Sequence, residues 1–235
     1  RMANCLELQG VEHVLEVGPG TGVLTQYLLN LNCTLHAIEL DRESIPVLVA
    51  KFPSLAQRLH HADLLRWKLP EPLTSEPFAL VGNYPYNISS QIVFWMIDKR
   101  DQIPEMAGMF QREVALRLAA DKGSKIYGVT SVLTQAYYQV DYLFTLDEHA
   151  FIPPPRVKSG VIHLRRHAIM PDVPYKDLAR VVKTAFGLRR KTLRNALKSL
   201  TFSNLELFES FAHLRAEQLS VADFINLAKH LSHEN

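Results

Sequence analysis

The sequence predicts an α/β fold with an open, mostly parallel sheet, followed by a smaller all-α domain. Over most of the chain, short apolar runs alternate with segments of helical periodicity. The first apolar run leads directly into a glycine-rich turn, as in nucleotide-binding α/β units. From Pro171 onward the strand-like runs stop and short amphipathic segments follow. We therefore expect a Rossmann-like domain over residues 1–168 and a helical domain over residues 169–235.

The expected elements follow this alternation in chain order. Apolar runs predict strands at residues 13–17, 34–40, 56–61, 78–81, 105–110, 139–146 and 160–165. Helical spacing predicts helices at residues 23–31, from residue 42, and at residues 91–97, 111–120 and 127–138. The second domain is expected to hold helices at residues 175–186, 192–200, 205–214 and 221–231.

The composition is that of an ordinary folded protein, with 47% hydrophobic and 21% charged residues among 235. No apolar stretch approaches the ~18 residues of a membrane span, and the first residues lack a signal-peptide pattern. We expect a cytoplasmic protein with no membrane partner. The first residue is Arg1, which suggests that the native chain begins further upstream. The two cysteines and ten histidines show no ligand spacing, so no metal site is expected.

The positive charge is concentrated in one segment. Residues 165–200 hold ten Lys or Arg against two Asp, a balance of +8 that leaves −6 on the rest of a chain whose total is +2. The cluster of Arg189, Arg190, Lys191, Arg194 and Lys198 puts cations on one helix and its leading loop. Such a cluster suits phosphate contacts on folded RNA, although a solvated charged face is the ordinary alternative.

The glycine turn Gly18-Pro19-Gly20-Thr21-Gly22 lies between the first expected strand and helix. Its spacing is G-x-G-x-G rather than the dinucleotide pattern G-x-G-x-x-G. We interpret Gly18 and Gly20 as positions where the backbone approaches a methionine moiety and a ribose rather than a pyrophosphate. A glycine-rich turn without a ligand is the alternative.

Acidic residues follow the next two expected strands. Glu39 lies about 20 residues after the turn, where an acid can accept both hydroxyls of an adenosine ribose. Asp41 is expected to cap the next helix. Asp63, with the Leu64 backbone beside it, would meet the amine of the adenine of a cofactor, or would simply cap a loop.

The stretch Gly82 to Ser90 follows the fourth expected strand and is where we place the chemistry. Pro85 pushes Tyr84 towards an extended conformation, so the Asn83 side chain and the Tyr84 carbonyl could face one pocket. Two acceptors could take both N–H bonds of an exocyclic amine and free its lone pair for attack. The Tyr86 ring could hold the base in line by stacking. The alternative is a Pro-containing turn with an Asn cap.

These residues carry a family resemblance. Asn83 to Tyr86 resembles the Asn-x-Pro-Tyr motif of S-adenosylmethionine-dependent adenine amino-methyltransferases, and Gly82 to Ser90 resembles the version found in rRNA adenine dimethyltransferases. Four further blocks resemble the bacterial small-subunit rRNA dimethyladenosine transferases. They are residues 108–118, residues 127–138, the Phe-x-Pro-Pro-Pro-Arg-Val-x-Ser block at residues 151–159, and residues 186–195.

The resemblance implies a function and a set of site residues. It implies dimethylation, with S-adenosylmethionine as donor and S-adenosylhomocysteine as product, of two adjacent adenines near the 3′ end of 16S rRNA in an assembling small subunit. Gly18, Glu39 and Asp63 would bind the cofactor, Asn83 would serve both cofactor and target, and Tyr86 and Phe151 would sandwich the adenine. We expect a monomer that does not act on DNA.

The sequence departs from the family pattern in two places. The family usually has Leu or Ile where this chain has Tyr84, which is compatible with use of the backbone carbonyl alone. Members also carry an upstream Gln-x-Phe-Leu segment that touches the methionine end of the cofactor, and nothing in this sequence matches it.

Three other functions remain open from the sequence. The first is a large-subunit rRNA methyltransferase of the macrolide-resistance type, which usually lacks the triple proline. The second is a non-catalytic RNA-binding assembly factor that keeps the fold, which the intact Asn83, Tyr86, Glu39 and Asp63 disfavour. The third is an NAD-dependent dehydrogenase, which the glycine spacing disfavours.

Overall fold

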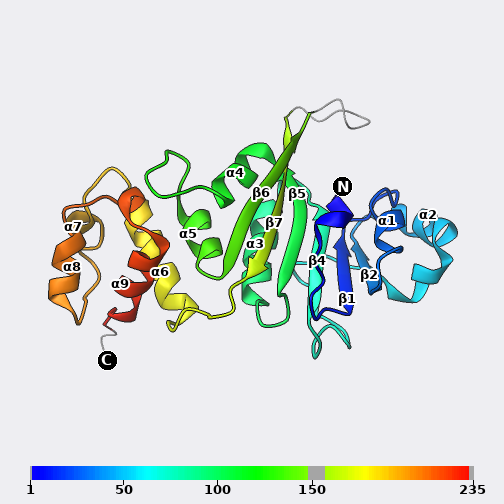
Figure 1. Ribbon diagram of the computed structural model, residues 1–235, viewed down its shortest axis with the longest axis horizontal. Helices are drawn as coiled ribbons and strands as arrows, with labels where there is room; N and C mark the ends of the chain where they lie inside the picture. Colours follow the sequence, from blue (N-terminus) through cyan, green and yellow to red (C-terminus); the bar gives the residue numbers. More distant parts are fainter. Residues whose placement is uncertain (1, 148–156, 233–235) are drawn as a thin grey trace. The chain divides into compact units, whose positions relative to one another are not determined.

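The computed structural model describes residues 2–147 and 157–232 (Figure 1). The chain forms two compact units. The first consists of Arg1–Ala115 with Gln139–Arg166, and the second of Leu116–Tyr138 with His167–Asn235. The second unit therefore includes a segment from the middle of the chain in addition to the residues expected for the helical domain.

The first unit is built on a seven-stranded sheet with the order β3-β2-β1-β4-β5-β7-β6. Strands β3, β2, β1, β4 and β5 pair in parallel, whereas β7 is antiparallel to β5. This arrangement confirms the α/β, Rossmann-like prediction. The strands are β1 (His13–Val17), β2 (Thr34–Glu39), β3 (Leu59–His61), β4 (Phe78–Asn83), β5 (Glu105–Gln111), β6 (Tyr138–Leu146) and β7 (Ser159–Arg166).

One face of the sheet carries a continuous apolar core. Alternate residues of the inner strands project to this face, among them Leu35, Ala79 and Val81. Leu28 of helix α1 and Leu55 of the 3-10 helix η2 pack against them. Because the inner strands are buried along almost their whole length, they read as apolar runs rather than as alternating patterns.

Helices and 3-10 turns connect these strands. They are η1 (Met2–Cys5), α1 (Thr25–Leu28), α2 (Ser44–Lys51), η2 (Pro53–Arg58), α3 (Ser89–Asp98) and α4 (Arg112–Leu118). The strand expected at residues 56–61 is wrong in its first half, because Pro53 starts a 3-10 helix that runs to Arg58. The helix expected at residues 23–31 is shorter, because the turn continues to Leu24.

The second unit is helical, and α6 lies beside α9 in Figure 1. Its core holds the stacked rings of Phe186 and Phe224, whose centroids lie 5.7 Å apart, with Tyr127 against Phe186. The helix expected at residues 127–138 is shorter, because Gly128 is extended and Tyr138 already begins β6. The elements are α5 (Val129–Gln135), α6 (Tyr175–Gly187), α7 (Leu193–Ala196), α8 (Leu205–Phe211), η4 (Ala216–Gln218) and α9 (Val221–Lys229).

Candidate active site

The strand registers bring the predicted site residues to one edge of the sheet. Val17 of β1 is level with Ile38 of β2 and with Gly82 of β4. The glycine turn, Glu39 and Asn83 therefore follow one another along the carboxyl ends of three neighbouring strands. The strand order reverses between β1 and β4, and such a switch point is where open α/β sheets bind ligands.

The three glycines of the turn have different roles. Gly18, Gly20 and Gly22 all have positive φ, at 67°, 55° and 79°. A Cβ on Gly22 would lie 2.3 Å from the Phe52 ring, so packing within the protein requires this glycine. A Cβ on Gly18 or Gly20 would meet nothing within 4 Å. Those two positions face open space in which a ligand can lie against the backbone.

Glu39 connects the second strand to the glycine turn. Its carboxylate accepts the Gly20 N–H at 2.9 Å through Oε2 and the Asp41 N–H at 2.9 Å through Oε1, and the residue is 8% exposed. A carboxylate has about four lone-pair positions, so two remain for the two hydroxyls of a ribose. Asp41 does not cap the next helix directly, because α2 begins at Ser44 with Glu43 at the N-cap position. Asp41 accepts instead from the Glu43 N–H and the Ser44 hydroxyl.

Asp63 lies two residues beyond β3, whose last residues pair with the end of β2. The Asp63 side chain is 36% exposed, and Oδ1 accepts the Leu65 N–H at 3.0 Å. Leu64 is buried beside it. The second carboxylate oxygen lies 3.8 Å from Arg66 Nε, which leaves it available to an amine. Open space at Gly18 and Gly20 with free acceptors on Glu39 and Asp63 fits an adenosine-containing cofactor such as S-adenosylmethionine.

The loop after β4 places neighbouring residues in contrasting environments. Asn83 is exposed, and its side chain forms no hydrogen bond to any described residue. The Tyr84 backbone N–H donates to the Met109 carbonyl at 3.1 Å, which ties the loop to β5. Pro85 is exposed, and its carbonyl accepts the Ile88 N–H at 3.2 Å. The Asn83 amide is thus left free for a ligand.

The Tyr84 ring is part of the core. It is 1% exposed, tilted against Phe110 at 4.9 Å between centroids, and packed over two glycines of the sheet. A Cβ on Gly108 would lie 2.0 Å from Tyr84 Cε2, and one on Gly82 would lie 3.0 Å from Cε1. Because the ring lies inside the protein, only the backbone of Tyr84 can meet a substrate.

Tyr86 is held at its backbone and at its hydroxyl. The Ser89 hydroxyl donates to the Tyr86 carbonyl at 3.1 Å, and the Tyr86 hydroxyl is 2.7 Å from Ser159 Oγ. Ser159 is the first residue of β7 and is fully buried. The predicted stacking partner Phe151 lies outside the described residues. In the sequence, Ser159 appears only as the last residue of the proline-rich block, and nothing in that pattern indicates its contact with Tyr86.

A buried acid behind the glycine turn was not predicted either. Glu16, on β1, is 1% exposed and accepts a hydrogen bond from the Thr25 hydroxyl at 2.7 Å. Burial raises the pKa of Glu16 to about 7, and the negative charge of Glu39 adds to this, while the Thr25 hydrogen bond opposes it. The signal in the sequence was a single charged residue in the middle of an otherwise apolar run before the turn.

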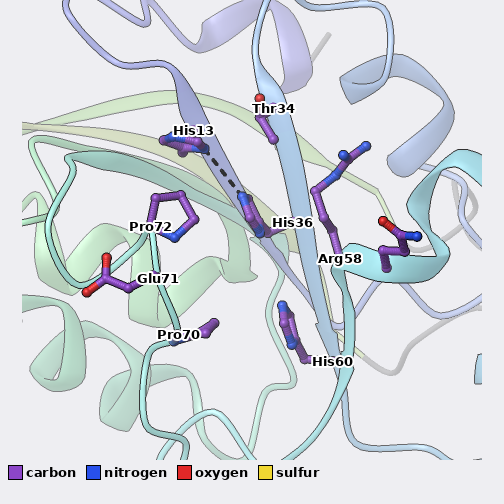
Figure 2. A pocket seen from close by; sticks show the side chains of 9 residues that line it. His13, Thr34, His36, Arg58, His60, Pro70, Glu71 and Pro72 are labelled. Atoms are coloured by element: carbon purple, nitrogen blue, oxygen red, sulfur yellow. Dashed lines mark hydrogen bonds between the residues drawn. The ribbon is translucent and has the colours of Figure 1, made fainter.

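A row of histidines lines a separate cavity of about 310 Å³ on the strands β1, β2 and β3 (Figure 2). His13 Nε2 is 2.9 Å from Glu76 Oε2, and His36 Nε2 is 3.3 Å from His13 Nδ1. Burial lowers the pKa of His36 to about 4, with His13, His60 and Arg58 adding to the shift. His36 Nδ1 and His60 Nε2 have no partner among the described residues and are shielded from solvent.

The five cations of the helical unit differ in their surroundings. Arg189 Nε is 3.1 Å from Glu217 Oε2, and the Arg189 guanidinium also donates to the Ser124 carbonyl. Arg194 forms a bidentate pair with Glu209. The remaining three cations are exposed and form no ion pair with a described residue; they are Arg190, Lys191 and Lys198.

Two kinds of feature are absent from residues 2–147 and 157–232. No group of three or more His, Cys, Asp or Glu side chains there is arranged to hold a metal ion. No helix in this part of the chain is long and apolar enough to cross a membrane.

The glycine turn leaves space for an adenosine-type cofactor, and the Asn-x-Pro-Tyr loop lies beside it at the switch point of the sheet. These two features define the protein as a Rossmann-like S-adenosylmethionine-dependent methyltransferase. Comparison with known proteins specifies it further, since a model of the family "Ribosomal RNA adenine dimethylase" matches residues 1–233. The chain belongs to this family. It is an S-adenosylmethionine-dependent rRNA adenine dimethyltransferase, and ribosomal RNA is its substrate.

Similar proteins cover nearly the whole chain. A Flavobacterium johnsoniae protein named Ribosomal RNA small subunit methyltransferase A is 48% identical over 97% of this chain and 88% of its own length. A Cytophaga hutchinsonii protein of the same name is 50% identical over 94% of this chain and 86% of its own length. A dimethyladenosine transferase from Plasmodium falciparum shares the fold, with a TM-score of 0.82 at 22% identity over 96% and 92%. The structure of the 23S rRNA methyltransferase ErmE has a TM-score of 0.71 at 25% identity and covers 97% of this chain and 96% of its own.

Proposed function

We propose that this enzyme dimethylates the exocyclic amines of two adjacent adenosines near the 3′ end of small-subunit (16S) rRNA during ribosome biogenesis. Relatives named as small-subunit methyltransferases, at 48–50% identity over almost the full chain, support the choice of subunit. The solved large-subunit enzyme is half as similar in sequence, at 25% identity.

The observation that carries the proposal is the environment of Asn83. It ends β4 directly beside the glycine turn that follows β1, and its amide is exposed and unused by the described residues. A polar side chain with no structural task at the switch point of the sheet is suited to a ligand.

In the proposed mechanism, the protein acts by positioning. The Asn83 side-chain oxygen and the Tyr84 carbonyl accept the two N–H bonds of the target amine, which makes its lone pair available. The Tyr86 ring stacks on the base after it has left its place in the RNA. Asn83, Tyr84, Pro85, Tyr86 and Phe151 form the proposed catalytic set, with Pro85 holding the loop extended and Phe151 as the second stacking ring. No general base need act before attack, because the amine nitrogen loses its proton after it has gained the methyl group and become acidic.

The cofactor is proposed to bind along the strand ends. When bound, S-adenosylmethionine supplies an electrophilic methyl group. Gly18 and Gly20 give it room at the backbone, Glu39 accepts from its ribose, and Asp63 with the Leu64 backbone meets its adenine. Asn83 contacts both cofactor and target, which aligns the two reactants.

The helical part supplies the contact with the rest of the rRNA. We assign catalysis to residues 1–168 and RNA binding to residues 169–235. The exposed Arg190, Lys191 and Lys198 are the proposed phosphate-binding cations. Arg189 and Arg194 would add to the local positive charge although each pairs with a glutamate. The proposed substrate is rRNA within an assembling small subunit. We propose that the protein acts as a cytoplasmic monomer and does not act on DNA.

The test is transfer of labelled methyl from S-adenosylmethionine to immature small subunits and, separately, to large subunits. Label on the small subunit alone supports the proposal. Label on the large subunit would select the macrolide-resistance type of enzyme instead. Tight binding of small subunits with no label on either would indicate a non-catalytic assembly factor.

A further inference from the structure

Ser159 is joined to the Tyr86 ring although 73 residues separate the two in sequence. The Tyr86 hydroxyl lies 2.7 Å from Ser159 Oγ, and Ser159 is its hydrogen-bond partner within the described part of the chain. The ring itself is half-buried, whereas Ser159 is 0% exposed. The hydroxyl of a half-buried tyrosine is therefore joined to a fully buried residue.

The strand that carries Ser159 is held firmly. Ser159 is level with Gln111 in the β5–β7 ladder, and the Arg112 N–H donates to the Lys158 carbonyl at 2.9 Å. At the next residue, a Cβ on Gly160 would lie 2.8 Å from Ala115 Cβ and 2.9 Å from the Tyr142 ring. The backbone on either side of the Ser159 hydroxyl is therefore closely packed, which makes that hydroxyl a fixed point.

The other end of Tyr86 is anchored independently. The buried Ser89 hydroxyl donates to the Tyr86 carbonyl at 3.1 Å. Ser89 fixes the backbone but leaves the side-chain torsions free, so the ring could still tilt about its Cα–Cβ bond. A hydrogen bond at the far end of the ring removes that freedom, because the hydroxyl cannot swing away without losing its partner.

We propose that Ser159 is a positioning residue for methyl transfer, which holds the Tyr86 ring in the plane on which the target adenine stacks. This inference rests on the function proposed above. Ser159 does not touch the base. It acts by fixing a neighbour that does, as the residues around a reactive group must when small displacements of the reactants slow the reaction.

The test is a double-mutant cycle on methyl transfer to immature small subunits by the full chain. Ser159→Ala removes one hydroxyl and Tyr86→Phe removes the other while keeping the ring. Each change is expected to lower kcat roughly 3- to 10-fold, the effect of one net hydrogen bond. The KM values for RNA and for S-adenosylmethionine should stay close to those of the wild type. The double variant should be no slower than the slower single variant.

A matched control separates positioning from stability. Ser131 is also fully buried, and its hydroxyl donates to the Arg117 carbonyl within the helical unit. Ser131→Ala should lower the Tm as Ser159→Ala does, but leave kcat unchanged. If Ser159→Ala does not fold, Tyr86→Phe still decides, because it must show the same loss of kcat.

The inference is overturned if either single variant retains wild-type kcat or if the two losses multiply in the double variant. Either result with an active wild-type enzyme leaves the proposed function intact. A wild-type protein that transfers no methyl to small subunits contradicts the proposed function and the inference together.

Discussion

Asn83 and Tyr84 are adjacent residues with opposite environments. The Asn83 amide is exposed and has no partner among the described residues, whereas the Tyr84 ring is buried against β4 and β5. Substitution at the first should therefore alter chemistry and leave folding alone. Substitution at the second should alter packing. Glu16, like Tyr84, is buried, so its substitution should also alter stability.

Replacing Asn83 with Ala should abolish methyl transfer with almost no effect on stability. No internal hydrogen bond to a described residue is removed, so the change in the free energy of unfolding should stay within about 0.5 kcal/mol. Affinity for small-subunit RNA should be nearly unchanged. Methyl-transfer kinetics, RNA titration and thermal unfolding measure the three quantities. Turnover at the wild-type rate would remove Asn83 from the mechanism.

Glu16 should make stability fall as the pH rises. Its pKa is about 7 in the folded protein and 4.5 ordinarily, so between these values the folded state binds more protons than the unfolded state. The stabilisation is complete below pH 4.5 and is lost as the pH rises through 7. Glu16→Gln should remove this loss, roughly 3 kcal/mol by pH 8. The measurement is the difference in unfolding free energy between the two proteins from pH 5 to 8. A constant difference would show that Glu16 does not titrate in this range.

Residues were predictable where a side chain stands out from its local pattern. Glu39 and Asn83 end β2 and β4, and Asp63 lies two residues beyond β3; the structure brings the ends of those strands to one edge of the sheet. The contact between Ser159 and Tyr86 was not predictable, because only the fold brings them together. Arg189 and Arg194 were predicted to contact phosphate, and the spacing of residues gave no sign of their acidic partners on later elements.

Strands β4 and β5 are shaped around one side chain. The Tyr84 ring fills the space that a Cβ on Gly108 would take, at 2.0 Å. Leu or Ile, the residues usual at this position in the family, would fill less of it. The glycine and the tyrosine are therefore expected to be coupled.

Gly108→Ala should destabilise the protein by roughly 1–3 kcal/mol through overpacking. Combining it with Tyr84→Leu should recover part of that loss, since the smaller side chain makes room for the new methyl group. Denaturant unfolding of the two single variants and the double variant measures the coupling. Gly187→Ala is the control, because a Cβ there meets nothing within 4 Å and should not destabilise α6. Strictly additive losses would contradict the coupling.

Elements were predictable in type and place more than in extent. The apolar runs located the strands of the sheet because inner parallel strands are buried on both faces. Boundaries failed where local backbone chemistry intervened. Pro53 began a 3-10 helix that covers the first half of an expected strand, and the extended Gly128 delayed an expected helix.

For the whole molecule, the positive charge is concentrated in one segment of the chain. The excess of +8 lies in residues 165–200, while the remainder carries −6. We propose that the first segment attracts the polyanionic rRNA and that the acids on the strand ends bind the cofactor. The segment Leu116–Tyr138, however, packs with the helical unit, which sequence order alone did not indicate.

Replacing Arg190, Lys191 and Lys198 together with Ala should flatten the salt dependence of RNA binding. These cations are exposed and unpaired with described residues, so each can release a counterion at a phosphate. The slope of log K against log salt should fall by up to about one for each phosphate that is no longer neutralised. Titrations at several salt concentrations measure it. Arg189→Ala should act mainly on thermal stability, because Arg189 is paired with Glu217, and only slightly on the slope. An unchanged slope in the triple variant would indicate another RNA surface.

Dimethylation of two neighbouring adenosines in small-subunit rRNA can be observed by mass-spectrometric mapping. The rRNA is taken from immature small subunits that have been incubated with S-adenosylmethionine and either the wild-type enzyme or Asn83→Ala. We expect N6-dimethyladenosine at two adjacent positions near the 3′ end with the wild type and none with the variant. Methylation at other positions, or equal methylation by both proteins, would contradict the proposed function.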